Sequence, residues 1–95
     1  MIVGVCKFTL DLFETQSLKE KRSVLASIKQ KVMNTFKVFV AEVEALDDPS
    51  CATLGIALAG SDENFVRDLL NKITTYIEDR EGLKISHDKV EVMTF

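Results

Sequence analysis

The stretch that decides the fold is "KVFVAEVEALDDPSCATLGIALA", residues 37–59. Its first part, residues 37–46, alternates between two sets of side chains, as a β-strand does with its two faces. Residues 51–59 alternate in the same way. Between the two runs lies "DDPS" (47–50), a turn sequence in which Pro49 stands where no ladder donor is needed. The stretch therefore predicts a β-hairpin.

A helix is predicted on each side of this hairpin. Upstream, "SLKE" (17–20) has the spacing of an S-x-x-E capping box, and apolar residues recur at helical spacing over 18–35. Downstream, Ser61 or Asp62 caps a second helix. Gly82 is typical of the residue that follows a helix end.

The two ends of the chain supply the remaining strands. Residues 2–13, "IVGVCKFTLDLF", alternate with one apolar face, and residues 89–95, "KVEVMTF", form the last strand. The order is β-α-β-β-α-β, and both crossovers should be right-handed. This predicts an α+β, ferredoxin-like βαββαβ sandwich with a four-stranded antiparallel sheet, two helices on one face, and a single domain over 1–95.

The expected strand order is 4-1-3-2, which has a consequence for the two cysteines. Cys51 should lie near Leu10 rather than near Cys6, about five residues of ~3.3 Å away, so we expect no disulfide. Two cysteines without C-x-x-C spacing are too few for a zinc site or an iron–sulfur cluster. We interpret both as small buried hydrophobic residues.

Composition limits the class of protein. The 95 residues are 46% hydrophobic and 28% charged, which is enough to fill a core and remain soluble. No apolar run approaches the ~20 residues that span a bilayer, so no membrane association is expected. The N-terminus lacks a basic start and Lys7 interrupts its apolar run, which predicts a cytoplasmic protein rather than a secreted one.

Charge is distributed unevenly along the chain. The net charge is −3, which argues against a general nucleic-acid coat. Residues 17–37, however, hold six cations and one anion, for a segment charge of +5, and the remainder carries −8. Such asymmetry can give a local anion-attracting surface on an acidic protein.

The start of the first helix concentrates this charge. Lys19, Lys21 and Arg22 crowd an N-terminus that already carries roughly half a positive charge, where each cation is disfavoured by about 0.3–1 kcal/mol. One interpretation is a solvated, tolerated cluster. The other is a phosphate site, extended along the helix by Lys29. Lys21 also falls inside the apolar stripe, where it must reach water or a partner.

The sheet face away from the helices should also be unusual, because its predicted side chains are small and apolar. RNA-binding sheets of the RRM type place stacking aromatics on their central strands, and here those positions lack aromatics. A second sheet could pack closely on such a face, so we expect a homodimer. The expected oligomer interface comprises Val3, Val5, Val40, Gly55 and Ala57.

No catalytic residue stands out. Glu42 and Glu44 are predicted on one face of an edge strand, where they could act as an acid–base or metal pair or protect the edge from aggregation. His87, in "KISHDKV", is expected in an exposed turn. No P-loop, G-x-S-x-G or H-E-x-x-H motif occurs. We therefore predict no enzyme, no bound metal and no cofactor.

Four segments of the chain are distinctive in combination: "MIVGV", "QSLKEKRSVL", "FKVFVAEVEALD" and "LGIALAGSDENFV". Together they resemble the YlxP-like family of small bacterial proteins of unknown function. The resemblance implies a ferredoxin-like fold, a cytoplasmic setting and a link to RNA or ribosome biology, but no known activity. One departure is "EALDDPSCA", which lacks the aromatic residue that the family often has there.

The leading hypothesis is a dimeric, non-enzymatic binding module that contacts RNA phosphates, ribosomal or other, through the start and flank of the first helix. The alternative is an interaction or regulatory domain that binds a protein or a small ligand on its open sheet face. An enzyme acting on a phosphorylated metabolite is the third and weakest hypothesis, because no general base or nucleophile is evident.

Overall fold

The computed structural model describes all residues, 1–95, and confirms the β-α-β-β-α-β order. The elements are β1 (Ile2–Asp11), α1 (Leu18–Phe36), β2 (Val40–Glu44), β3 (Cys51–Gly60), α2 (Glu63–Glu81) and β4 (Ile85–Thr94). The fold is therefore the predicted ferredoxin-like α+β sandwich. Ser17 and Asp62 are the N-cap residues of the two helices, and Gly82 follows α2 in the left-handed conformation, as expected.

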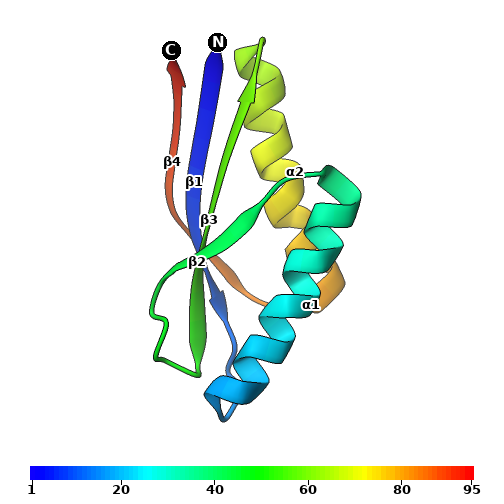
Figure 1. Ribbon diagram of the computed structural model, residues 1–95, viewed down its shortest axis with the longest axis vertical. Coiled ribbons are helices and arrows are strands. Elements are labelled where there is room, and N and C mark those ends of the chain that lie inside the picture. Colours follow the sequence, from blue (N-terminus) through cyan, green and yellow to red (C-terminus); the bar gives the residue numbers. More distant parts are fainter.

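The sheet has the predicted strand order, β2-β3-β1-β4, and every neighbouring pair is antiparallel. Figure 1 shows both helices on one side of this long, twisted sheet, with the other side uncovered. The two chain ends lie side by side on the central strand β1 and the edge strand β4, where the amino group of Met1 donates to the Phe95 carbonyl at 3.1 Å.

The core fills the space between the sheet and the helices. The inward residues of the two central strands are those that the alternation predicts. The most buried of them are Phe8, Leu10, Ala52, Leu54 and Ile56, and Leu12, just after β1, joins them in the core. Glycine lets α2 approach the sheet closely. A Cβ at Gly4 would overlap Val66, and a Cβ at Gly60 would lie 2.9 Å from Val66 Cγ2.

The faces of β2 are the reverse of the expectation. Val40 was predicted on the outward face, but it is 4% exposed, lies opposite Ile56 and belongs to the core. Phe39, Ala41 and Val43 face outward instead. The alternation of residues 37–46 predicts two faces but not which of them is buried. The inner face is the one on which Glu42 meets its partner, Lys21.

Two irregularities also modify the prediction for the edge strands. A register shift between Glu42 and Glu44 turns these carboxylates to opposite faces, so the prediction that they share one face is wrong. Strand β4 begins at Ile85 rather than at residue 89. His87 is therefore opposite Phe8 in the sheet and not in a turn, although it remains exposed.

The register sets the positions of the cysteines. Cys51 lies opposite Asp11, one residue from the expected Leu10, and Cys6 lies opposite Ile56. The two thiols are free, and five residue pairs of β1 and β3 separate them along the strands.

Candidate functional site

The N-terminus of α1 is capped by side chains of the chain itself. Ser17 Oγ accepts a hydrogen bond from the Glu20 backbone N–H at 3.1 Å, which is the first half of the predicted capping box. The Glu20 carboxylate bonds to the Gln16 N–H at 3.4 Å rather than to that of Ser17. Because a carboxylate of the chain already sits at this helix end, the N-terminus offers little to an external anion.

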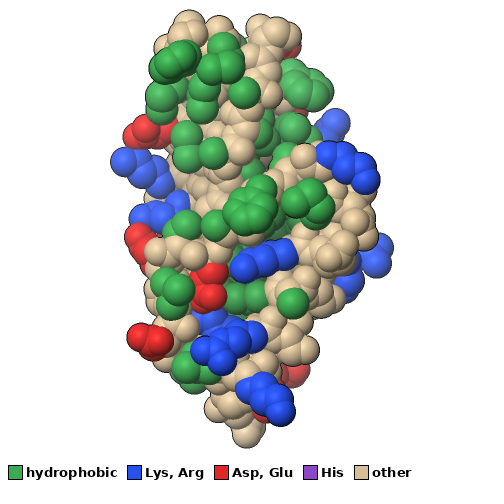
Figure 2. Space-filling view, in the orientation of Figure 1, with side chains coloured by type: hydrophobic (Ala, Val, Ile, Leu, Met, Phe, Trp, Pro, Cys, Tyr) green, Lys and Arg blue, Asp and Glu red, His purple; other side chains and the backbone are tan.

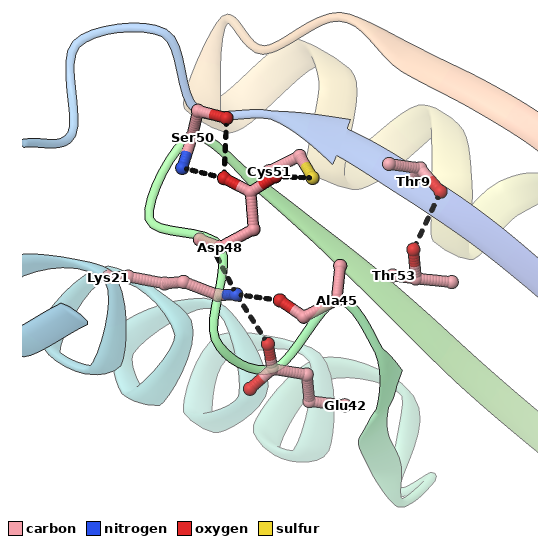
Figure 3. A network of polar contacts seen from close by, with 8 residues as sticks. All are labelled: Thr9, Lys21, Glu42, Ala45, Asp48, Ser50, Cys51 and Thr53. Atoms are coloured by element: carbon pink, nitrogen blue, oxygen red, sulfur yellow. Dashed lines mark hydrogen bonds and ion pairs between the residues drawn. The ribbon is translucent and has the colours of Figure 1, made fainter. Parts of the chain in front are cut away.

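Lys21 is the most unusual side chain at this end, because it is charged and only 1% exposed. Its ammonium nitrogen contacts three oxygens: it donates to the carbonyls of Ala45 and Asp48, both at 2.7 Å, and lies 2.8 Å from Glu42 Oε2. Figure 3 shows this side chain reaching from α1 into the turn between β2 and β3. Two hydrogen bonds and one ion pair thus hold the ammonium inside the protein.

This geometry corrects the prediction for Lys21. It lies in the apolar stripe of α1, as the helical spacing indicates, but it does not reach solvent and cannot join an anion-binding surface. The Glu42 carboxylate depends on it in turn, because no donor other than this ammonium contacts Oε2. Lys21 and Glu42 therefore form a buried ion pair that joins α1 to the hairpin.

The turn that Lys21 holds has its own internal bonds. Asp48 Oδ1 accepts from the backbone N–H of Ser50 at 2.9 Å and from its hydroxyl at 2.6 Å. These hydrogen bonds lower the pKa of Asp48, since they favour the ionised carboxylate. Ala45 occupies the left-handed region at φ 57°, and its carbonyl accepts from Lys21 and from the Asp48 N–H.

Three of the predicted cations remain available on the surface of α1. Lys19 and Arg22 are exposed, Lys29 is half-buried, and none of them forms an ion pair. We call these three residues the basic flank. Lys31, by contrast, pairs with Glu81 of α2 at 3.0 Å and lies on the other side of the helix.

The basic flank lies on the side of α1 that is turned away from α2. Thr35 and Lys31 mark the side toward α2, through their bonds to Tyr76 and Glu81. In Figure 2, Lys and Arg side chains lie along the α1 side of the visible face, beside the edge strand β2. The surface is therefore open to a large partner.

The second candidate site is the outer face, by which we mean the side of the sheet away from the helices. It contains a groove of ≈ 590 Å³. The apolar lining includes Val5, Phe39, Ala41, Val43, Gly55 and Ala57. Three of the expected interface residues, Val5, Gly55 and Ala57, are therefore present here, and Val3 shares the face through its position on β1. The prediction missed Phe39 and Val43, which are 72% and 45% exposed.

The other end of the outer face is polar. Lys7 Nζ donates to Glu44 at 2.7 Å, and this hydrogen bond and charge raise the pKa of Lys7. Thr9 shares a hydrogen bond with Thr53 at 2.9 Å and donates to Asp88 at 2.6 Å. The outer face is thus divided into an apolar region and an internally paired polar region.

The remaining chemically interesting groups do not form a site. Burial raises the pKa of both thiols, Cys6 and Cys51, and the hydrogen bond to Asp48 raises that of Cys51 further. Both cysteines are therefore protonated near neutral pH and are poor nucleophiles or metal ligands. No group of three or more His, Cys, Asp or Glu residues is arranged to hold a metal ion. Neither helix is long and apolar enough to cross a membrane.

Comparison with known proteins identifies the family. A family model described as "Protein of unknown function (DUF503)" matches residues 3–89. The chain belongs to the DUF503 family. It is 29% identical over 77 residues to the uncharacterized protein YlxP of Bacillus subtilis (strain 168), an alignment that covers 81% of this chain and 84% of that protein. The expected YlxP-like relationship is thereby confirmed, and DUF503 membership carries no stated activity.

One sequence signal could have revealed the buried ion pair of this DUF503 protein. A lysine inside an apolar helical stripe that does not reach water needs a polar partner, and an acid on the facing strand is a suitable one. Glu42 and Glu44 are the two acids on β2, so this pairing would turn one of them inward. That requirement would have placed Val40 in the core, because Val40 and Glu42 lie two residues apart on one face.

Proposed function

We propose that this protein is a non-catalytic, cytoplasmic binding module that contacts the phosphate backbone of RNA through the basic flank. The observation that carries the proposal is that Lys19, Arg22 and Lys29 have no ion-pair partner in the chain, whereas the other two cations of α1 do. Unpaired surface cations can neutralise phosphates and release their counterions, which gives salt-dependent affinity.

The surroundings of the flank support this proposal. Glu20 is the only acidic residue of α1, and its carboxylate is turned to the start of the helix. Small or neutral side chains lie between the cations, including exposed Ser23 and Ala26, so a phosphate backbone can approach the helix closely. Lys19 and Lys29 are ten residues apart, ~15 Å along the helix axis, a span that accommodates several phosphates.

Co-sedimentation with ribosomes and ribosomal subunits at two salt concentrations tests the proposal. The native protein should sediment with them at low salt and be released at high salt. The variant Lys19→Glu/Arg22→Glu should lose this association, because two phosphate contacts become repulsive. The matched control is Lys72→Glu/Lys84→Glu, which makes the same charge change at exposed sites elsewhere and should still sediment.

Two results would contradict phosphate binding by the flank. The native protein could fail to sediment with ribosomes or subunits at low salt. Alternatively, both double variants could lose association equally, which would show that net charge, rather than this surface, controls it.

A second candidate function is protein interaction through the outer face, and the groove of ≈ 590 Å³ favours it. An exposed apolar surface of this kind is typical of an interaction site. The fluorescent probe bis-ANS should bind this face in protein that is diluted until no partner covers it, and Ala57→Arg should reduce the signal under the same conditions. Unchanged fluorescence in that variant would show that the probe, and the accessible apolar surface, lie elsewhere.

A further inference from the structure

We infer that the outer face packs against the same face of a second copy of this chain, about a two-fold axis that runs parallel to the strands between β1 and β3. This inference rests on the second candidate function, because it names the partner of that face. It does not depend on phosphate binding by α1.

The register of the two central strands carries the inference. Val3 lies opposite Ala59, and Val5 lies opposite Ala57, all on the outer face. Strand β1 therefore presents a ridge of valines, and β3 beside it presents a shallow trough of alanines. A two-fold axis midway between these strands places Val3 and Val5 of one copy over Ala59 and Ala57 of the other. The symmetry repeats the same contacts with the two copies exchanged.

The pattern ends at the next residue pair, Lys7 and Gly55. The ammonium of Lys7 reaches across β3 to Glu44 of β2 at 2.7 Å. A Cβ at Gly55 would lie 3.1 Å from Val43 Cγ1, so side chains of the same chain fill the space above this glycine. Large-over-small packing is therefore confined to the pairs Val3–Ala59 and Val5–Ala57, and sheets that interdigitate in this way approach closely.

The same axis covers an exposed aromatic side chain of the outer face. It lays β2 of one copy across β4 of the other, because these are the two outer strands of the sheet. Phe39, beside β2, is 72% exposed and lines the groove together with Ala57. In the dimer β4 of the partner covers this ring. Met93 of β4 pairs with Val3, beyond the end of β2, so β2 of the partner does not reach it.

Charge on the outer face allows a second copy to approach. The β2 rim carries Glu44, paired with Lys7, and the β4 rim carries Lys89, paired with Glu91 at 3.2 Å. When β2 lies across the partner's β4, Glu44 comes near the partner's Lys89. Along the strands, Lys89 is level with Gly55 and Glu44 is level with Thr53, which is two residues away. Each cation of the face therefore meets an anion, although the chain carries a net charge of −3.

The size of the face is adequate for a stable dimer. Strands lie ~4.8 Å apart and rise ~3.3 Å per residue; β1, β3 and β4 have ten residues each and β2 has five. The projected area of the face is therefore roughly 550 Å². A standard interface buries about 800 Å² of accessible surface per partner, and accessible surface exceeds the projected area. A second copy fits better than an unrelated protein, because the match of valine to alanine is a property of this chain against itself.

Sedimentation equilibrium over a range of protein concentrations tests the inference. The native chain should sediment as a dimer. Ala57→Arg should sediment as a monomer, because an arginine cannot be accommodated beneath the partner's Val5. The matched control is Thr75→Arg, which introduces the same charge at an exposed site on α2 and should remain dimeric.

An exchange of side chains tests the axis itself. Val5→Ala should weaken the dimer, because it leaves a gap over the partner's Ala57, and Ala57→Val should weaken it by overpacking. Each change enters the interface twice, so the dissociation constant should rise at least about tenfold. The double variant Val5→Ala/Ala57→Val restores large-over-small packing and should recover most of the affinity.

Three outcomes would overturn the inference. A native monomer at every concentration would exclude the second copy, and bis-ANS binding to that monomer would leave the second candidate function intact with a different protein as partner. A dimer that survives Ala57→Arg would use another surface. A double variant no tighter than the two single variants would show that Val5 and the partner's Ala57 do not meet.

Discussion

The two helices occupy equivalent places in the two βαβ halves, but they are attached to the sheet by different chemistry. Helix α2 packs on β1, β3 and β4 through apolar side chains, and Val66 reaches the backbone at Gly4. Helix α1 packs on β2 and α2, and its first turns are held by the ion pair of Lys21 with Glu42. A repeated topology thus does not impose a repeated mode of packing.

The surfaces of the two helices differ in the same way. Helix α2 carries charges of both signs, with five acidic and three basic residues; Arg67 pairs with Glu63 at 3.1 Å, and Arg80 lies 5.5 Å above the Tyr76 ring. The charges of α1 are almost all positive, and three of them have no partner. The proposed phosphate contact depends on this difference, because it requires cations that no acid of the chain neutralises.

The largest effect should come from the ion pair that is unique to α1. Lys21→Met keeps the aliphatic stem but leaves the carboxylate of Glu42 and the Asp48 carbonyl without their donor, and the Ala45 carbonyl with only the Asp48 N–H. Removal of one partner of a buried pair destabilises a protein by about 3–5 kcal/mol. Urea unfolding should show this loss, and the neighbouring exposed Arg22→Met should change the free energy of unfolding by no more than about 0.5 kcal/mol.

The double variant Lys21→Met/Glu42→Leu separates an ion pair from a mere packing defect. An apolar replacement of both partners is often neutral or stabilising, so the double variant should regain much of the lost stability. If it is as unstable as Lys21→Met alone, the two carbonyls bound by Lys21, and not Glu42, carry the effect.

A smaller effect is expected on the α2 side, where contact is apolar. Gly4→Ala introduces a Cβ that overlaps Val66 and should destabilise the protein by about 1–3 kcal/mol in thermal or urea unfolding. Truncation of the opposing side chain in Gly4→Ala/Val66→Ala should recover part of this loss. Equal destabilisation in both variants would mean that backbone strain, rather than the contact with α2, limits this position.

The smallest effect concerns the turn beneath α1 and depends on pH. The pKa of Asp48 is lowered in the folded protein, so its bonds to Ser50 stabilise the fold above the ordinary value of 3.8. This contribution is lost as the pH falls through the folded-state pKa. The stability difference between the native protein and Asp48→Asn, measured by urea unfolding, should therefore shrink from about pH 6 to about pH 2.5. A constant difference would contradict this role.

Much of the fold could be predicted because its signals are local. The alternation of β1 and β3, the caps at Ser17 and Asp62 and the turn before Cys51 each depend on residues that are close in sequence. The inward face of β2 could not be predicted in this way. It depends on Glu42 meeting Lys21, which is 21 residues earlier in the chain and on a different element.

The candidate site shows the same division. Sequence patterns located the cations of α1 and most of the small residues of the outer face. They could not distinguish Lys21 from Arg22, adjacent residues of like charge, because burial is decided by what lies against each side chain. They also missed Phe39, since it precedes a strand whose outward face was assigned in reverse.

By itself, the sequence determined the order of elements, the strand order expected for that topology and the excess of positive charge on α1, because periodicity, caps and composition act over a few residues. Only the tertiary structure decided which of those charges is neutralised inside the protein and which side chains line the outer face. Both depend on the contact of segments far apart in the chain, where a single ion pair selects the buried face of a strand.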